Sequence, residues 1–328
     1  MPAVFYDGPM IVSASYRTDI PAFYGQWFAR RFREGFARVA NPYGGPPATV
    51  PLRDGNDGFV FWTRNAQPFL PMLAEVRAAG LPFVVQYTVT GLPRALERSV
   101  TGPTQAVETI RRLAGEYGPH TVVWRFDPIL FTSLTPPDHL ADTFARLADG
   151  LAGLVDEAVI SFANPYRKTV RNLDAAAATH DFSWWDPPAG EKRALAGRLG
   201  VLAGERGMAL TLCSQADLVG PSTRPAACVD AGRLERVAAD WGMARIIAAR
   251  IKGNRPDCRC HESRDIGAYD TCPHGCVYCY AVGSRDAAAA RHAAHDPTAA
   301  FLGAGPPPSH CPDDAGPLPG HDRPVGQS

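Results

Sequence analysis

The feature that most constrains the fold of this sequence is a regular alternation of short apolar runs with amphipathic helical patterns. Six runs rich in β-branched and aromatic residues span residues 11–15, 58–63, 82–90, 121–128, 157–164 and 208–215. Their near-continuous apolarity is typical of parallel strands that are covered on both faces. Between them, apolar side chains recur at helical spacing, as in the group Leu234, Val237, Ala238 and Trp241. The alternation predicts parallel strand–helix–strand units.

Two architectures satisfy this pattern, an open doubly wound sheet and a (β/α) barrel. The stretch "SASYRTDIPAF" after the first predicted strand contains no glycine-rich phosphate loop, which disfavours a dinucleotide-binding sheet. We therefore expect an α/β fold with a full or partial TIM-like barrel over residues 1–250. Residues 243–251 fit either a seventh strand or a continued helix. A cysteine-rich segment over 251–303 should pack on the barrel mouth, and the Pro/Gly-rich tail, 304–328, is expected to be disordered.

Composition bears on partners and location. Lys plus Arg and Asp plus Glu both number 33, so the chain lacks the basic excess usual in proteins that bind nucleic acid non-specifically. A small polar molecule, a peptide or a nucleotide is the favoured partner, and nucleic acid is not. No apolar run approaches the length of a membrane span, and the N-terminus does not resemble a signal peptide. We expect a cytoplasmic protein without membrane contact, in which the eight cysteines serve metal or redox chemistry.

The ends of the predicted strands are unusually polar, and barrel enzymes build their sites at these ends. The candidate catalytic residues there are Arg17, Asp19, Arg125, Asp127 and Lys168, and the candidate cofactor contacts are Arg64 and Gln86. A guanidinium within an apolar strand needs a partner, and Asp127 lies on the same strand face as Arg125. The alternative is that these two residues form a purely structural ion pair. The basic run 164–172 fits a solvated loop or a site for a carboxylate or phosphate.

The stretch "YDTCPHGCVYCYA" carries three cysteines, Cys272, Cys276 and Cys279. Three thiolates can each bind one iron of a [4Fe–4S] cluster and leave the fourth iron open to a small chelating ligand. Ferredoxin-type clusters and structural zinc sites usually take four protein ligands, so this triplet suits them less well.

This spacing, with an aromatic residue before the last cysteine, resembles the signature of the radical S-adenosylmethionine enzymes. The resemblance implies a [4Fe–4S] cluster on the three cysteines, S-adenosylmethionine on the open iron, and Tyr278 beside the adenine. It also implies a 5′-deoxyadenosyl radical and an electron donor such as a flavodoxin or ferredoxin. In that family the triplet usually follows the first strand. Here it follows all six predicted strands, so its loop must fold back over the barrel mouth, and the family's Gly-Gly-Glu stretch is replaced by "FVFWTRNAQP".

The chain also resembles a bacterial family of unknown function, numbered 1848 among such domain families, over roughly residues 11–302. The resemblance rests on "SASYRTDIPAF", "FVFWTRN", "VVWRFDPILFT", "ISFANPYRKT" and "DIGAYDTCPHGCVYCYA". The shorter stretch "HGCVYCYA" is similar to the cluster loop of spore photoproduct lyase relatives, which implies nucleic-acid repair as an alternative function.

Four further cysteines lie upstream of the triplet, at Cys213, Cys228, Cys258 and Cys260. They fit an auxiliary iron–sulfur cluster or a structural zinc site, and the alternative is a set of scattered buried thiols. His261 and His274 lie close to the cysteines in the sequence and are alternative ligands, although His274 is better interpreted as a loop residue. Cys311 in the tail is expected to be free.

Three functions therefore remain open from the sequence. The first is a radical S-adenosylmethionine enzyme acting on a polar substrate. The second is a non-catalytic zinc or iron–sulfur protein that senses redox state. The third is a barrel hydrolase or nuclease that uses Asp19, Asp127 and His residues with a divalent metal, an expectation based on architecture alone.

Overall fold

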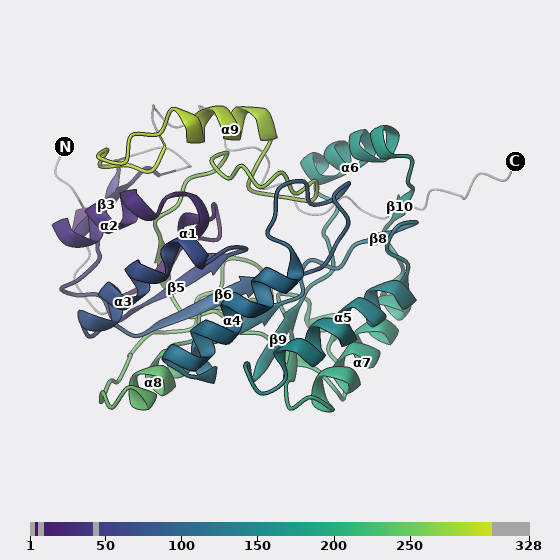
Figure 1. Ribbon diagram of the computed structural model, residues 1–328, viewed down its shortest axis with the longest axis horizontal. Coiled ribbons are helices and arrows are strands. Elements are labelled where there is room, and N and C mark those ends of the chain that lie inside the picture. The colour runs from purple at the N-terminus through teal and green to yellow at the C-terminus, as the bar shows by residue number, and fades with distance from the viewer. Residues whose placement is uncertain (1–3, 6–9, 42–45, 304–328) are drawn as a thin grey trace, which may run out of the picture.

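The computed structural model describes residues 4–5, 10–41 and 46–303 of the 328-residue chain. Its centre is an eight-stranded parallel sheet flanked by helices (Figure 1). In spatial order the strands are β12 (Arg224–Pro225), β11 (Ala209–Leu212), β9 (Glu157–Ile160), β7 (Val122–Arg125), β6 (Phe83–Thr88), β5 (Gly58–Thr63), β2 (Ile11–Ala14) and β13 (Ser263–Asp265). All six predicted strands are present, and the predicted α/β class is confirmed.

Neighbouring strands from β2 to β12 follow one another along the chain, and β13 then adds to the opposite edge, beside β2. The sheet thus takes its last strand from residues 263–265, beyond the expected barrel range of 1–250. Within the described residues, strand pairing does not join β12 to β13. A single backbone hydrogen bond, 2.9 Å from the amide of His261 to the carbonyl of Val229, links the segments next to these two strands.

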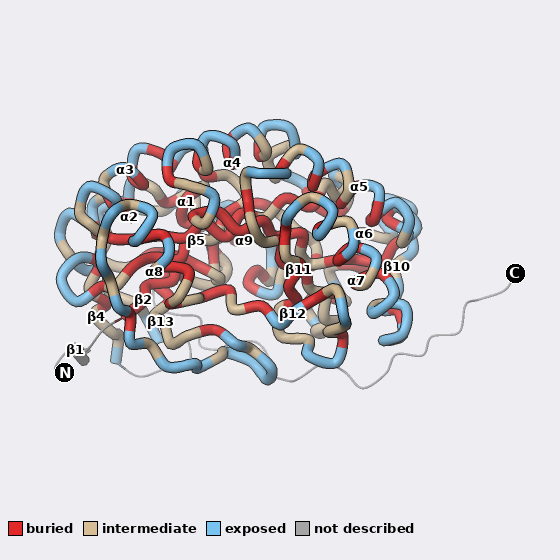
Figure 2. Tube along the Cα trace, turned by 90° about the horizontal axis from the view of Figure 1, so that it is seen from below, coloured by how far each residue is buried: buried red, intermediate tan, exposed pale blue. Residues whose placement is uncertain are grey.

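The helices α2, α3, α4, α5, α7 and α8 lie where apolar spacing predicts them, whereas α6 and α9 were not predicted. Figure 2 shows α2 to α5 around the buried strands with their outer faces exposed. Their bounds are α1 (Ile20–Phe23), α2 (Gly25–Glu34), α3 (Leu70–Ala78), α4 (Pro103–Tyr117), α5 (Pro137–Leu151), α6 (Arg167–His180), α7 (Ala189–Gly204), α8 (Ala231–Asp240) and α9 (Arg285–Ala293). Single 3₁₀ turns occur at η1 (Gln67–Phe69), η2 (Pro119–Thr121) and η3 (Ala216–Leu218).

Alternate residues of the strands point to opposite faces of the sheet, and each face has its own core. One face packs against α2, α3, α4, α5 and α7 and contributes residues such as Phe59, Phe83 and Trp124. The other face, here called the α8 face, packs against α8 and the segments around it; its strand residues are Ile11, Val60, Val84, Val123 and Val159. The second core is smaller and includes the cysteines Cys228 and Cys260.

Several elements were not predicted. The basic run 164–172 is not a loop throughout, because its residues from Arg167 onward form the first turns of α6, where the alanine-rich stretch that follows favours a helix. Residues 243–250 form neither a strand nor a helix. A small sheet pairs β1 (Val4–Phe5), β4 (Ala48–Pro51) and β3 (Phe36–Val39), and β8 (Phe131–Thr132) pairs antiparallel with β10 (Trp184–Trp185). The predicted tail, 304–328, and Cys311 lie outside the described residues.

Candidate functional site

A polar layer lies on the α8 face, two residues beyond the apolar layer along each strand. Because side chains two apart on a strand share a face, this layer is fixed by the same register that places the core. Its members are Ser13, Trp62, Gln86, Arg125, Ser161 and Cys213, with Asp265 from β13. The α8 face thus changes from apolar to polar toward the carboxyl ends of the strands, where sites are built in parallel sheets.

Arg125 is the central cation of this layer. Its Nε donates to Oδ1 of Asp127 at 3.0 Å, its Nη2 donates to Oδ2 at 2.5 Å, and its Nη1 donates to Gln86 Oε1 at 3.0 Å. Nη1 also lies 3.0 Å from Sγ of Cys228, and the guanidinium covers the ring of Trp62 at 5.0 Å. Burial alone would lower the pKa of Arg125, but Asp127 together with Cys228 and Cys213 outweighs this effect, so the pKa of Arg125 rises well above its usual range. Arg125 and Asp127 therefore form a buried, bidentate pair.

Gln86 is fully engaged by the same cluster. Its Nε2 donates to the carbonyl of Cys228 at 2.8 Å, while its Oε1 accepts from Arg125. The sequence suggested Gln86 as a cofactor contact, but its nearest cysteine is Cys228 of the upstream group and both ends of its amide are occupied.

Arg17 lies at the junction of β2 and β13. Asp265 accepts hydrogen bonds from Ser13 at 2.8 Å and Ser15 at 2.7 Å, and Arg17 Nε lies 3.8 Å from its Oδ1. The Arg17 guanidinium packs against the rings of Tyr16 and Tyr269, at 5.5 and 5.3 Å. Its Nε is buried without a hydrogen-bond partner within the part of the chain described, so this cation retains donor capacity.

Asp19 joins two strand ends to the cysteine loop. Its Oδ1 caps α1 by accepting from the amide of Ala22 at 3.0 Å, and its Oδ2 accepts from the amide of Arg64 at 2.8 Å. The same Oδ2 lies 2.8 Å from Nε2 of His274, which belongs to the loop between the first two cysteines of the triplet. His274 therefore anchors the loop to Asp19.

Arg64, Glu97 and Tyr278 form a second buried polar cluster. Nη1 of Arg64 lies 2.8 Å from Oε1 of Glu97, and its Nη2 donates to the Tyr278 hydroxyl at 2.5 Å. The Tyr278 hydroxyl donates to Glu97, which also accepts from Thr90 at 2.7 Å. Burial raises the pKa of Tyr278 well above its usual range, so this phenol stays a neutral donor. Burial alone would lower the pKa of Arg64, but Glu97 and the other acidic groups around it together outweigh this effect, so the pKa of Arg64 rises.

The cysteines of the triplet, Cys272, Cys276 and Cys279, lie beside this cluster, near the carboxyl ends of the strands. Their thiols are close enough to interact electrostatically with one another. Cys276 interacts with Arg64, and Cys279 with Lys168, whose Nζ donates to the Tyr280 carbonyl at 3.1 Å. Burial raises the pKa of all three thiols, that of Cys276 to about 12. In Figure 1 the yellow-green segment before α9 crosses the side of the molecule that carries α1 and α6.

The triplet loop is held by backbone and side-chain anchors from distant elements. The amide of Ser99 donates to the carbonyl of His274 at 3.0 Å, and the amide of Val277 donates to Leu96 at 3.0 Å. The Tyr24 hydroxyl donates to the carbonyl of Thr271 at 2.6 Å. Gly275 has a φ of +74°, and a Cβ there would come within 2.5 Å of the Arg285 side chain, so the turn requires glycine.

The upstream cysteines, Cys213, Cys228, Cys258 and Cys260, come together although they are distant in sequence. Sγ of Cys228 lies 3.6 Å from Sγ of Cys213, and the amide of Val229 donates to Sγ of Cys260 at 3.4 Å. Hydrogen bonds link Cys228 to Cys260 and Cys260 to Cys258, and Cys258 interacts in turn with Cys213. The hydrogen bond with Cys260 lowers the pKa of Cys258 to about 6. The sequence alone left scattered thiols as an alternative, whereas these four are neighbours.

Neither cysteine group is arranged around a single metal ion. Among residues 4–5, 10–41 and 46–303, no three His, Cys, Asp or Glu side chains are placed to hold one such ion. The seven cysteines of that part of the chain are all free thiols. The donor set available at the triplet is three half-buried cysteines, two of which, Cys276 and Cys279, have cationic neighbours. Such a donor set suits iron–sulfur ligation better than the binding of oxygen-liganded divalent ions.

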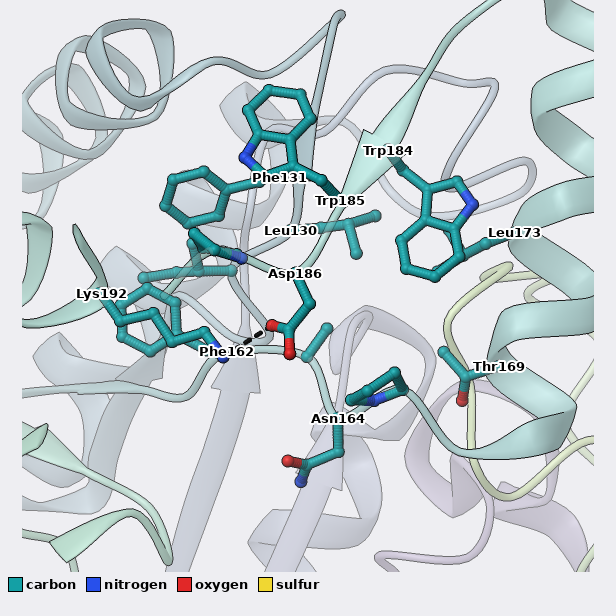
Figure 3. A pocket seen from close by; sticks show the side chains of 14 residues that line it. Leu130, Phe131, Phe162, Asn164, Thr169, Leu173, Trp184, Trp185, Asp186 and Lys192 are labelled. Atoms are coloured by element: carbon teal, nitrogen blue, oxygen red, sulfur yellow. Dashed lines mark ion pairs between the residues drawn. The ribbon is translucent and has the colours of Figure 1, made fainter. Parts of the chain in front are cut away.

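A separate small pocket lies between β8, β10 and α6 (Figure 3). Its aromatic walls include Phe131, Phe162 and Trp184, and Lys192 pairs with Asp186 across 2.6 Å. The cavity volume of about 10 Å³ holds roughly one water molecule. It is too small for a nucleotide or a peptide side chain, so it does not serve as the substrate site in this conformation.

Comparison with known proteins gives one match. A family model described as Domain of unknown function (DUF1848) matches residues 11–281. The chain belongs to this family. The matched range contains every strand of the eight-stranded sheet and all seven described cysteines. No curated protein and no solved structure matches the chain. In the described residues, no helix has the length and apolar character needed to cross a membrane.

Two functional residues escaped sequence reasoning, Glu97 and Asp265. Glu97 lies in the loop after β6, in the charged stretch "PRALERSV", and in such a stretch the sequence predicts a solvent-exposed carboxylate. Its burial follows from an isolated bridge with Cys276, which no local pattern reveals. Asp265 ends the polar strand β13, and only the pairing of β13 with β2 brings it to Ser13 and Ser15.

Proposed function

We propose that this protein is a radical S-adenosylmethionine enzyme in which Cys272, Cys276 and Cys279 hold a [4Fe–4S] cluster. The observation that carries the proposal is the meeting of three half-buried cysteines beside the strand-end residues Asp19 and Arg64. Three cysteines leave one iron of such a cluster without a protein ligand. When bound and reduced, the cluster supplies the electron that cleaves S-adenosylmethionine into methionine and a 5′-deoxyadenosyl radical.

The protein's own residues fix the triplet and its surroundings. Asp19 holds the His274 side of the loop, and Arg64 fixes Tyr278 one residue before the third cysteine. Glu97 neutralises Arg64, so the site next to Cys276 carries a paired rather than an isolated charge. This pairing keeps the loop rigid where it must present three sulfurs to one cluster.

Two cations are available to bind the carboxylate of the cofactor or a polar substrate. Arg17 has a buried Nε without a hydrogen-bond partner among the described residues, although it lies 3.8 Å from Asp265. Lys168, at the start of α6, interacts with Cys279. Arg125 is already bidentate with Asp127, so we assign that pair to positioning the polar layer rather than to contact with the reacting atoms.

We further propose that the eight strands form a TIM-like barrel. The order of the strands along the sheet matches such a barrel, because β13 lies beside β2, and the hydrogen bond between His261 and Val229 lies between the two edges. The polar layer would then line the barrel mouth. The triplet loop would cover that mouth, because it follows all six predicted strands and must fold back over them.

The competing function is a non-catalytic iron–sulfur protein that senses redox state, and the fully paired state of Arg64 and Arg125 favours it. Electron paramagnetic resonance separates the two. If one iron is open, S-adenosylmethionine added to the anaerobically reduced protein changes the spectrum of the cluster, and the Cys272→Ser variant loses that response. A reduced cluster whose spectrum is indifferent to S-adenosylmethionine would contradict the proposal.

A further inference from the structure

Two of the upstream cysteines, Cys213 and Cys228, bring their thiols into direct contact beside the polar layer. Sγ of Cys228 donates to Sγ of Cys213 across 3.6 Å. The two residues belong to adjoining parts of the sheet, since Cys213 directly follows β11 and Cys228 follows β12. Both are free thiols in the structure, and the function proposed above uses neither of them.

The backbone fixes these two positions relative to each other. The amide of Ala226 donates to the carbonyl of Leu212 at 2.8 Å, which continues the pairing of β12 with β11 up to the two cysteines. The segment that joins the cysteines packs closely on α7, where a Cβ at Gly200 would lie 2.5 Å from the carbonyl oxygen of Ser222. The fold itself therefore holds the two sulfurs together.

Such a pair can close into a disulfide with little movement of the main chain. A disulfide bond is about 2.05 Å long, so each of the two sulfurs has to move by roughly 0.8 Å, a shift that side-chain rotation supplies. In a reducing compartment, which the sequence leads us to expect, disulfides are usually transient and serve redox chemistry. The contact therefore fits reversible oxidation rather than a permanent bridge.

The two thiols differ in exposure and in their neighbours. Cys213 is half-buried, whereas Cys228 is 3% exposed. Nη1 of Arg125 lies 3.0 Å from Sγ of Cys228, and the carbonyl of Cys228 accepts from Gln86 at 2.8 Å. A cation beside a sulfur favours the thiolate, which is the form that attacks a disulfide. Cys213 is thus placed to meet an oxidant and Cys228 to complete the exchange.

We propose that Cys213 and Cys228 form a reversible dithiol–disulfide site whose oxidant is a low-molecular-weight disulfide. The Cys213 thiolate attacks one sulfur of the oxidant and forms a mixed disulfide, and the first thiol of the oxidant leaves. Cys228 then attacks Sγ of Cys213, the bond to the oxidant breaks, and the second thiol leaves. The protein loses two electrons and two protons, and the two released thiols carry both.

Oxidation would change the polar layer at its central cation. Arg125 keeps its bidentate contact with Asp127 and its hydrogen bond to Gln86. The sulfur beside its Nη1, however, becomes part of a disulfide, which cannot carry a negative charge. The site therefore couples the polar layer at the carboxyl ends of the strands to the thiol–disulfide balance around the protein.

The pair exchanges slowly at neutral pH. The contact with Cys213 lowers the pKa of Cys228, but the contact with Cys260 and burial outweigh it and raise this pKa to about 12. The contact with Cys228, followed by burial, raises the pKa of Cys213 well above its usual range. Because both thiols are protonated at neutral pH, the site has to be measured at equilibrium rather than by its rate.

The test equilibrates the full-length wild-type protein with glutathione buffers of increasing ratio of oxidised to reduced form. After acid quenching, alkylation and trypsin, mass spectrometry follows the peptide 207–233, which contains both cysteines because Arg224 precedes a proline and is not cleaved. We expect this peptide to change from doubly alkylated to an unalkylated form about 2 Da lighter than the reduced peptide, and dithiothreitol to reverse the change. A peptide that stays doubly alkylated at every ratio, or glutathione that persists on Cys213 beside a free Cys228, would overturn the proposal.

Two variants identify the roles of the thiols. Cys228→Ser should stop at the mixed disulfide of Cys213 with glutathione, and an unmodified Cys213 in that variant would contradict its role as the attacking thiol. The matched control, Cys258→Ser/Cys260→Ser, also removes two thiols of the upstream group and should still form the disulfide; its loss would overturn the proposal.

Circular dichroism identifies a variant that fails to fold, and in that case the wild-type peptide alone decides. Zinc that stays with the wild-type protein and prevents oxidation until it is removed would also overturn the site. None of these outcomes depends on cleavage of S-adenosylmethionine, so the dithiol site and the function proposed for the triplet can fail separately.

Discussion

The Arg64–Glu97 pair offers the sharpest quantitative prediction. The Arg64 side chain is 12% exposed and that of Glu97 is 2% exposed, and their charged atoms lie 2.8 Å apart. Removing one partner of a buried pair costs about 3–5 kcal/mol, because the remaining charge is left without compensation. In Arg64→Met, Glu97 keeps hydrogen bonds from Tyr278 and Thr90, so we expect the lower end, about 3 kcal/mol.

A surface pair provides the matched control. Arg33 and Glu75 lie 2.5 Å apart, but their side chains are 62% and 40% exposed. Exposed pairs contribute about 0–1 kcal/mol, so Arg33→Met should change the free energy of unfolding by no more than that. The contrast between two short pairs isolates burial as the cause.

Urea denaturation followed by circular dichroism, on reduced protein stripped of metal, gives the two free energies. The double variant Arg64→Met/Glu97→Gln should recover part of the loss, since it removes the uncompensated charge, with a coupling energy of at least about 1 kcal/mol. If Arg64→Met is no more destabilising than Arg33→Met, the buried-pair reasoning is wrong.

The remaining predictions concern the loop, the C-terminal segment and β13. Gly80→Ala should cost about 1–2 kcal/mol for its positive φ alone, and Gly275→Ala should cost more, because a Cβ at Gly275 also meets the Arg285 side chain. Urea midpoints compare the two variants, and equal losses of stability would refute the contribution of the clash with Arg285. Burial lowers the pKa of His295 below 6.5, so protonation of this residue opposes folding, and the stability present above pH 6.5 is lost as the pH drops. His295→Gln should flatten this decline, and an unchanged dependence of the free energy of unfolding on pH would contradict the prediction. Asp265→Asn should cost about 1–3 kcal/mol, because a carboxylate oxygen that accepts a hydrogen bond from Ser13, Ser15 or the backbone is replaced by an amide nitrogen, which donates. An unchanged temperature of thermal unfolding would show that Asp265 does not anchor β13 to β2.

The sequence predicted the parts of the fold that depend on local apolarity. The strands β2, β5, β6, β7, β9 and β11 are apolar enough to be read without tertiary context. The strand β13, "SRD", has no apolar residue, and it is a strand only because it pairs with β2 and its Asp265 is satisfied by Ser13 and Ser15. No propensity or periodicity predicts such an edge strand.

The candidate site was predictable where polar residues end apolar strands, as at Arg64 and Arg125. It was not predictable where a loop closes from a distance, because Glu97 reaches the site only through the bridge between its loop and Cys276. The grouping of the four upstream cysteines likewise depends on the tertiary approach of β11, the segment before α8 and the segment before β13.

The central claim is that the triplet holds a cluster with an open iron that cleaves S-adenosylmethionine. The most direct measurement is the yield of 5′-deoxyadenosine and methionine after anaerobic reconstitution, addition of S-adenosylmethionine and reduction. We predict both products in equal amounts from the wild-type protein and none above background from Cys276→Ser. A wild-type protein that carries a reduced [4Fe–4S] cluster on the triplet and forms neither product would contradict the claim.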